Sequence, residues 1–353
     1  MFTKDLLAPR VDACAKHIIT AVGSSSKLKG SIFVDNVWQT TPSQSRPRIY
    51  DNYQAVYNDP NVDIVYVGTP HSLHKQNCLD GIAAGKHVLC EKPFTINEAD
   101  AQEVVDAARE RGVLGMEAMW VRFNPIFREL HEELYVKKSI GEIRRFVIDF
   151  GNKVDLDSLP ADSRMKDPAL GAGALLDIGV YTLTYASFIL GEGRVGMDHP
   201  HSRVTSSLSI VGGIDESNVV VLGYPPRNSK RSSTAVCSST FHYKSADDFA
   251  RIEGSNGEIV IFGMATSVPG GFRIKSGSQP GHGEADKREE QVFKVERPEG
   301  TLGFFWEADA VADDIANGRT ENAVMPLDET LRMMRLMDGI RRDGGLRYPQ
   351  DRW

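Results

Sequence analysis

Short apolar runs rich in β-branched residues alternate with segments of helical spacing between residues 17 and 119. The apolar runs predict strands at residues 17–23, 62–69, 87–90 and 113–119, with a short strand near Ile49. The other segments predict helices at residues 73–84 and 98–111, each followed by a glycine, Gly85 or Gly112, in the position favoured just after a helix. Strands that alternate with helices indicate a doubly wound, Rossmann-type sheet in residues 1–120.

After residue 141, most of the predicted strands follow one another directly. They lie at residues 143–150, 204–211, 218–223, 233–243 and 258–262. Helices are predicted at residues 173–190, 304–317 and 327–342, and the polar stretch 270–300 is expected to form an exposed hairpin or loop. We expect a second domain in residues 121–353, with an open-faced and mostly antiparallel sheet whose closing helices pack back on the first domain.

The expected fold class is therefore α/β plus α+β, and it has a consequence for assembly. An open antiparallel sheet leaves one of its faces without a cover. A second copy of the same sheet is the simplest cover, so we expect a homodimer through the second domain.

Composition and charge narrow the range of partners. The chain has 353 residues, of which 41% are hydrophobic and 25% are charged, which is enough for two domains with separate cores. A net charge of -7 argues against the concentrated basic face that a nucleic acid or an anionic membrane would need. A small molecule is the expected partner.

The cysteines and the first residues bear on the compartment. Cys14, Cys78, Cys90 and Cys237 show no paired spacing, and three of them lie in apolar stretches, so we expect reduced thiols. The first residues lack the apolar core of a signal peptide, and we expect no membrane-spanning segment elsewhere. A cytoplasmic protein is expected.

Three side chains are candidates for proton transfer. Lys92 follows the strand 87–90, at the edge where open α/β sheets bind ligands, while Asp177 and Tyr181 lie four residues apart on one face of a helix. In one pocket they would form a proton-transfer set, because a positive charge favours the phenolate and a carboxylate can orient a hydroxyl. Taken singly, each also has a structural explanation as a surface lysine, a first-turn acid or a half-buried aromatic.

Three motifs occur in order: TPHSLH at residues 69–74, GKHVLCEKP at residues 85–93 and GAGALLDIGVY at residues 171–181. Together they resemble the glucose–fructose oxidoreductase/inositol dehydrogenase/rhizopine catabolism family. Tyr181 in place of the more common histidine, and MEAMWVRFNP at residues 116–125, are similar to the branch with dimeric dihydrodiol dehydrogenases and fungal NADP-dependent D-xylose 1-dehydrogenases. The resemblance runs from about residue 2 to the C-terminus.

The resemblance implies a dehydrogenase that moves a hydride between nicotinamide and a CH–OH group of a pyranose sugar or a cyclic trans-dihydrodiol. The implied catalytic residues are Lys92, Asp177 and Tyr181. Tyr181 would take the hydroxyl proton, and Lys92 would lower the pKa of Tyr181 and hold the substrate. The residues implied in cofactor binding are Thr69, Pro70, His71, His74, Glu91, Lys92, Trp120 and Arg122, with Phe123 as a further pocket residue or a core aromatic.

The run Ser24, Ser25, Ser26 and Lys27 follows the strand 17–23, where the adenosine ribose of a dinucleotide lies in such a fold. Hydroxyls and a lysine suit a 2′-phosphate, whereas an acid would repel it, so NADP is preferred over NAD. A serine that caps the next helix is a compatible alternative. His71 and His74 have no third ligand nearby in sequence, and no metal site is assigned.

The start of the chain departs from the family pattern. A dinucleotide fold begins with a strand, a G-x-G-x-x-G turn and a helix, but residues 2–7 are typical of the remainder of that helix only. The strand and the glycine turn are missing, which leaves a sheet edge open and removes amides that bind the diphosphate. We expect a truncated gene model or an alternative start, and weak folding or cofactor binding by the chain as written.

Two functions therefore remain open. The first is an NADP-dependent dehydrogenase, and the second is a catalytically impaired or regulatory nucleotide-binding relative. The missing phosphate loop favours the second function, whereas the presence of Lys92, Asp177 and Tyr181 together favours the first.

Overall fold

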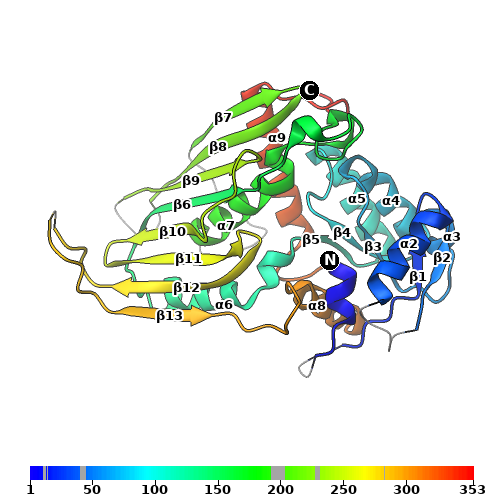
Figure 1. Cartoon of the computed structure of the whole chain (residues 1–353), viewed down its shortest axis with the longest axis horizontal. Helices are drawn as coiled ribbons and strands as arrows, with labels where there is room; N and C mark the ends of the chain where they lie inside the picture. The colour runs from blue at the N-terminus through cyan, green and yellow to red at the C-terminus, as the bar shows by residue number, and fades with distance from the viewer. Residues whose placement is uncertain (11–12, 14, 40–44, 192–202, 227–230, 282) are drawn as a thin grey trace.

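The computed structural model describes residues 1–10, 13, 15–39, 45–191, 203–226, 231–281 and 283–353 (Figure 1). Cys14 lies outside the described residues. Strands and helices alternate in the first part of the chain, as predicted. They are α1 (Phe2–Leu7), β1 (Ala21–Gly23), α2 (Lys27–Trp38), β2 (Arg48–Tyr50), α3 (Tyr53–Tyr57), β3 (Ile64–Val67), α4 (His71–Ala83), β4 (His87–Glu91), α5 (Glu98–Arg111) and β5 (Gly115–Ala118).

Helix α5 has the bounds that its sequence predicts. The Asn97 side chain accepts the amide hydrogen of Asp100 at its start, and Gly112 takes a left-handed conformation, with φ of 68°, at its end. Acids lie in its first turn and arginines in its last, which suits the helix dipole. Its small and β-branched face, which includes Val104 and Val105, is buried in the core.

The parallel strands form two separate sheets rather than one. β1 pairs with β2, while β3, β4 and β5 form a second sheet in that order. The predicted strand 17–23 was too long, because only Ala21–Gly23 pairs.

The second part of the chain places its helices around one large sheet. Its short helices are η1 (Trp120–Phe123), η2 (Glu132–Val136), η3 (Leu156–Ser158), η4 (Pro168–Leu170) and η5 (Leu175–Gly179). Its α-helices are α6 (Pro125–His131), α7 (Val180–Leu190), α8 (Phe304–Ala316) and α9 (Leu327–Gly344). α8 contacts α1, and α9 contacts α5, so both closing helices touch the first domain.

The large sheet has eight strands in the order β13-β12-β11-β10-β6-β9-β8-β7 (Figure 1). They are β6 (Ile143–Gly151), β7 (Arg203–Val211), β8 (Ile214–Tyr224), β9 (Ser233–Thr240), β10 (Asp248–Gly254), β11 (Gly257–Ala265), β12 (Val268–Ser276) and β13 (Glu290–Lys294). Every neighbouring pair is antiparallel except β6 and β9. The predicted fold class is confirmed.

The sequence did not predict β10 as a strand, and it predicted an exposed hairpin or loop for the stretch 270–300, which holds most of β12 and all of β13. Strand β12 begins Val-Pro-Gly-Gly, which is typical of a turn, and β13 is exposed and polar except for two residues. Within the polar stretch 270–300, β12 and β13 pair as an antiparallel hairpin. Cross-strand pairing thus decides these strands more than their own side chains do.

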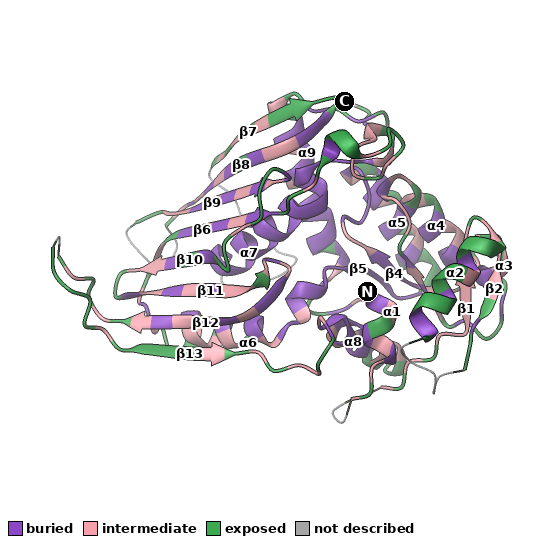
Figure 2. Ribbon diagram, viewed as in Figure 1, coloured by how far each residue is buried: buried purple, intermediate pink, exposed green. Residues whose placement is uncertain are grey.

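Helix α7 covers one face of the large sheet, and all its residues are buried (Figure 2). The segment Pro168–Leu190 is long and apolar enough to cross a membrane, with a mean hydropathy of 1.4, which corrects the expectation that no segment would be. In the most apolar window of this segment, 94% is buried inside the protein, so packing on the sheet accounts for the apolar character. The sequence also predicted one helix over 173–190, whereas its first turn, η5, is a π-helix.

Candidate active site

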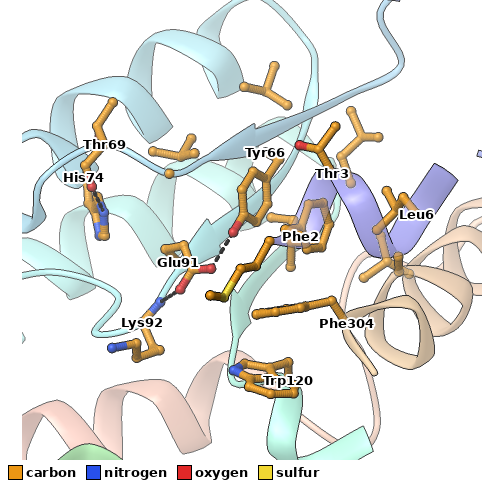
Figure 3. Close-up of a pocket in the computed structure, with 18 of the residues that line it drawn as sticks. Phe2, Thr3, Leu6, Tyr66, Thr69, His74, Glu91, Lys92, Trp120 and Phe304 are labelled. Atoms are coloured by element: carbon orange, nitrogen blue, oxygen red, sulfur yellow. Dashed lines mark hydrogen bonds between the residues drawn. The ribbon is translucent and has the colours of Figure 1, made fainter. Parts of the chain in front are cut away.

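A cavity of about 1680 Å³ opens where the two domains meet. Its walls come from the carboxyl ends of β1, β3 and β4, from η1 and η5, and from α1 and α8. In Figure 3, Phe2, Tyr66, Glu91, Lys92 and Phe304 surround one part of it. Segments far apart in the sequence therefore meet at the edge where parallel sheets bind ligands.

Lys92 and Asp177 meet in this cavity, as the sequence predicts. The Lys92 ammonium donates to the backbone carbonyl of Asp177 at 2.5 Å and lies 3.2 Å from its carboxylate oxygen Oδ1. Burial alone would raise the pKa of Asp177, but the charges of Lys92, His71 and Arg164 outweigh it and lower the pKa to about 2. Asp177 is therefore a carboxylate that keeps the ammonium in place.

Tyr181 lies beside this pair at the start of α7. The indole Nε1 of Trp120 donates to its hydroxyl at 2.7 Å, and the Lys92 ammonium lies 5.3 Å from the centre of its ring. Phe150 packs edge-on against the same ring. The phenol is thus held by one hydrogen bond, one ring contact and one nearby ammonium, and Tyr181 lines the cavity.

The structure corrects the expected effect of Lys92 on this tyrosine. Burial raises the pKa of Tyr181 well above its usual value, and the nearby carboxylate of Glu91 adds to the rise. The carboxylates of Asp177 and Glu307 act in the same direction, and the hydrogen bond from Trp120 opposes the rise. Tyr181 is therefore a protonated acid in the free protein.

Backbone contacts fix the loop that carries Lys92. Glu117 of β5, whose pKa burial raises to about 7, accepts the amide hydrogen of Phe94 at 3.0 Å. Glu91 accepts the amide hydrogen of Lys92 at 3.2 Å and a hydrogen bond from the hydroxyl of Tyr66 (Figure 3). These contacts leave the ammonium little freedom to leave the cavity.

His74 lies between two backbone carbonyls. Its Nδ1 is 3.0 Å from the oxygen of Pro93, and its Nε2 is 2.7 Å from the oxygen of Thr69. Burial lowers the pKa of His74 in spite of these contacts, so the ring is neutral and can donate to one carbonyl at a time. It connects the end of β3 to the loop of Lys92.

His71 is the second histidine at this end of the cavity. Its Nδ1 lies 3.0 Å from the carbonyl oxygen of Gly171, and burial lowers its pKa to about 3. Both histidines line the cavity together with Thr69, Pro70 and Glu91, all of which the resemblance assigned to cofactor binding.

The serine run divides into two roles. Ser24 and Ser25 line the far end of the cavity, whereas Ser26 caps α2 by accepting the amide hydrogen of Lys29 at 3.3 Å. The Lys29 ammonium donates to the hydroxyl of Ser25 at 3.3 Å. Lys27 begins the helix and is not among the cavity-lining residues. Lys29, which the sequence analysis missed, is the basic residue that reaches the serines.

Arg122 is not where the resemblance placed it, and Phe123 takes the second of its two expected positions, as a core aromatic. Arg122 is buried outside the cavity lining, and its guanidinium pairs with Glu329 at 2.7 Å. Glu329 also pairs with Arg332 at 2.7 Å, which ties η1 to α9. Arg122 therefore supports Trp120 from behind, and Phe123 packs on the core.

The sequence analysis did not identify three further residues that line the cavity. Arg164 lies 3.5 Å from the carboxylate of Asp177, Tyr66 bonds Glu91, and the ring of Phe304 stacks on Trp120 at 4.1 Å. Arg164 is a single arginine in a polar loop, which carries no signal of its own. Phe304 comes from α8, far along the chain, so only the tertiary fold brings it here.

The cavity fits the two ends of a nicotinamide dinucleotide. It runs from Ser24 and Ser25 at the end of β1 to Lys92 and Tyr181, which suits an adenosine ribose at one end and a nicotinamide at the other. For the diphosphate between them, the described residues offer no glycine-rich turn that joins a strand to α1. The described residues therefore supply groups for both ends of the dinucleotide but no such turn for its diphosphate.

Comparison with known families agrees with this geometry. Residues 2–118 match the model of the oxidoreductase family with an NAD-binding Rossmann fold, and residues 129–260 match the GFO/IDH/MocA C-terminal domain.

Two characterised relatives are similar along most of this chain. The D-xylose 1-dehydrogenase (NADP(+)) of Hypocrea jecorina is 34% identical over 99% of this chain and 90% of its own length. The trans-1,2-dihydrobenzene-1,2-diol dehydrogenase of Xenopus tropicalis is 30% identical over 97% of this chain and 93% of its own.

Solved structures share the fold at lower identity. An aldose–aldose oxidoreductase from Caulobacter crescentus, 24% identical, has a TM-score of 0.74 over 94% of this chain and 91% of its own. A 3-ketoreductase from Actinomadura kijaniata in complex with NADP, 23% identical, has a TM-score of 0.74 over 97% and 92%. By its sequence and its fold, this chain belongs to the GFO/IDH/MocA family of oxidoreductases.

Proposed function

We propose that this protein is an NADP-dependent dehydrogenase that oxidises a CH–OH group of a pyranose sugar, of the D-xylose 1-dehydrogenase type, or of a cyclic trans-dihydrodiol. The observation that carries the proposal is the meeting of Lys92, Asp177 and Tyr181 in one cavity. Similarity to a D-xylose dehydrogenase and to dihydrodiol dehydrogenases supports the choice of substrates.

The chain's own residues supply proton transfer and orientation, and bound NADP would supply the hydride acceptor. The Tyr181 oxygen exchanges a proton with the substrate oxygen, since Tyr181 is the cavity tyrosine beside Lys92 and Asp177. Lys92 donates a hydrogen bond to that same substrate oxygen, and Asp177 holds the ammonium in place. Trp120 and Phe150 exclude water from around the phenol.

The preference for NADP rests on the end of β1. Ser24 and Ser25 offer hydroxyls there, and the Lys29 ammonium lies within hydrogen-bond distance of Ser25. An acid at this point would bind the ribose 2′-hydroxyl and repel a 2′-phosphate, whereas a hydroxyl and an ammonium attract the phosphate. The described thiols Cys78, Cys90 and Cys237 are free and buried, which supports the proposal of a cytoplasmic enzyme.

A substrate panel tests the proposal. The purified protein is mixed with NADP or NAD and with D-xylose, D-glucose or trans-1,2-dihydrobenzene-1,2-diol, and the absorbance of reduced nicotinamide is followed. We expect reduction of NADP by at least one of these alcohols, at a higher rate than reduction of NAD. Tight binding of NADP without turnover of any of them would instead support the regulatory relative.

The state of Tyr181 predicts opposite pH profiles for the two directions of reaction. Oxidation requires the phenolate, and because burial raises the pKa of Tyr181, the phenolate fraction increases with pH throughout the neutral range. We expect kcat/KM for oxidation to rise by up to roughly tenfold per pH unit between about pH 6 and 9. Carbonyl reduction, which uses the phenol, should stay level over the same range. An oxidation rate that falls with pH would contradict this assignment.

We also propose that the protein is a homodimer through the open face of the large sheet. One row of side chains on this face crosses four neighbouring strands in register. It consists of Val221 of β8, Val236 of β9, Val147 of β6 and Arg251 of β10. The opposite face is covered by α7, which leaves this row of valines without a cover within the described chain. A second copy related by a two-fold axis would bury it.

A charge placed on this face of the sheet should prevent the dimer. Val219, 43% exposed on the same face, is replaced by glutamate, with Val324→Glu, at an exposed valine away from the sheet, as the matched control. We expect light scattering at micromolar concentration to show a dimer for the wild type and for Val324→Glu, and a monomer for Val219→Glu. A monomeric wild-type protein would count against the proposal.

A further inference from the structure

Two buried carboxyl groups lie outside the cavity lining, one in each domain. Glu117 belongs to β5 of the first domain, and Asp215 belongs to β8 of the large sheet (Figure 1). Glu117 is 1% exposed and Asp215 is fully buried. Burying a carboxyl group costs free energy unless hydrogen bonds replace its water, so the contacts of these two groups indicate why each one is there.

Glu117 holds the segment that carries Lys92. Its Oε1 accepts the amide hydrogen of Phe94, two residues after Lys92, at 3.0 Å. Thr330 of α9 is the other hydrogen-bonding side chain beside this carboxyl group. Phe94 is itself buried, so water cannot replace Glu117 as the acceptor of this amide.

Asp215 holds the segment that carries Asp177. Its Oδ2 accepts the amide hydrogen of Leu175, the first residue of η5, at 2.8 Å. The side-chain amide of Asn218 donates to the same oxygen at 2.8 Å and so fixes the carboxyl group. A Cβ on Gly173 would lie 2.4 Å from Oδ1 of Asp215, so a glycine is needed for the chain to pass this close.

The two carboxyl groups have the same electrostatic character. Burial raises the pKa of Glu117 to about 7 and that of Asp215 to about 7, so both are partly neutral near neutral pH. A neutral carboxyl group and a carboxylate each offer an oxygen to an amide hydrogen. The two backbone contacts therefore need an acceptor oxygen and do not need a charge.

We propose that Glu117 and Asp215 are positioning residues for the proton-transfer set. Each would fix the backbone of one of the two segments that meet where the Lys92 ammonium donates to the carbonyl of Asp177. Their joint effect would be to keep Lys92 and Tyr181 directed at one substrate oxygen. A displacement of about 1 Å in either segment would be enough to slow the reaction. The role in turnover rests on the proposed dehydrogenase function.

Amide exchange tests the two contacts without any turnover. Glu117→Gln and Asp215→Asn keep an acceptor oxygen, whereas Glu117→Met and Asp215→Leu remove it at similar side-chain size. The amide of Phe94 should exchange with deuterium at least roughly tenfold faster in Glu117→Met than in the wild type or in Glu117→Gln. The amide of Leu175 should respond to the two Asp215 variants in the same way. Equal protection in the polar and apolar variants would overturn the proposal.

The same variants should differ in turnover. We expect kcat to fall at least roughly tenfold in Glu117→Met and in Asp215→Leu, with less than about a twofold change in the dissociation constant for NADP. Glu117→Gln and Asp215→Asn should keep kcat within about twofold of the wild type. A loss of kcat that is as large in the polar variants as in the apolar ones would show that the acceptor oxygen is not what matters.

Asn322→Leu is the matched control for the loss of a buried acceptor. The side chain of Asn322 is buried and accepts the amide hydrogens of Val324 and Met325, but it is not among the cavity-lining residues. This variant should lose stability and keep its kcat. An equal loss of kcat in Asn322→Leu would mean that general destabilisation, and not positioning, explains the effect.

A combined variant shows whether Glu117 acts through Lys92. In the Lys92→Met background, Glu117→Met should lower kcat/KM by less than about twofold, because the ammonium that it positions is already gone. A full and additive loss would contradict the positioning role. A wild-type protein that oxidises none of the alcohols would contradict the proposed dehydrogenase function instead, while the exchange of Phe94 and Leu175 would still decide whether the two carboxyl groups hold these segments.

Discussion

Replacing Tyr181 with phenylalanine should lower the turnover of alcohol oxidation by a factor of roughly 10² or more, with little change in the affinity for NADP. The substitution removes the hydroxyl that exchanges the proton and leaves the ring against Phe150. It also leaves the indole N–H of Trp120 without its acceptor, which should cost about 1 kcal/mol of stability. Turnover and NADP titration are measured on the same preparation.

Tyr185 provides the matched control, one turn further along α7. Its hydroxyl is also buried and donates to the backbone carbonyl of Thr266, but Tyr185 is not among the cavity-lining residues. Tyr185→Phe should lose a similar amount of stability and keep its turnover. Unchanged turnover in Tyr181→Phe, or an equal loss in both variants, would contradict the assignment of Tyr181.

Replacing Lys92 with methionine should have the second large effect. We expect kcat/KM to fall by roughly 10³, because the substrate oxygen loses its charged donor where charge changes during the reaction. The variant also leaves Asp177, 13% exposed and still near Arg164, without its closest positive partner. Stability should fall by about 2 kcal/mol, less than for a fully buried pair. Kinetics and thermal melting measure the two effects separately.

A double variant further separates the effect on turnover from the effect on stability. Lys92→Met with Asp177→Asn should recover most of the stability, since no unpaired carboxylate remains, but none of the turnover. Lys75→Met is the control for the loss of an ion pair away from the cavity, because Lys75 pairs with Asp100 at 2.9 Å. If turnover returned in the double variant, Lys92 would be a structural residue and not a catalytic one.

The sequence predicts the strands of the first domain well where both faces are covered. β4, at His87–Glu91, has a buried centre, so its apolar run is continuous and easy to recognise. β13 has one exposed and polar face, and its pairing with β12 cannot be read from its own residues. The sequence also predicts strands at β1 and β3, which lie in two separate sheets.

The candidate site could be predicted in its residue types but not in its electrostatics. Lys92, Asp177 and Tyr181 were identified from motifs and spacing, and they meet in the structure. The pKa of Tyr181 was expected to fall and instead rises, because the phenol is buried and the carboxylate of Glu91 lies near it. Neither the burial of the phenol nor its distance from a charged side chain can be read directly from the order of residues.

The position of the Arg122 side chain could not be predicted from the sequence either. The motif at residues 116–125 suggested that Arg122 contacts the cofactor. The Arg122 side chain instead pairs with Glu329, which lies more than 200 residues later in the sequence. Only the packing of η1 on α9 decides this direction. By contrast, Thr69, His71 and His74 line the cavity because the start of α4 directly follows β3, a connection that the sequence pattern predicts.

One measurement tests the central claim, that Lys92, Asp177 and Tyr181 serve a CH–OH dehydrogenase. The wild-type protein is incubated with NADP and with D-xylose or the trans-dihydrodiol that carries deuterium at the carbon to be oxidised, and the reduced nicotinamide is analysed by mass spectrometry. The account predicts NADPH that carries the deuterium, formed at least roughly 10² times faster than by Tyr181→Phe. NADPH without deuterium, or no NADPH from either alcohol, would contradict it.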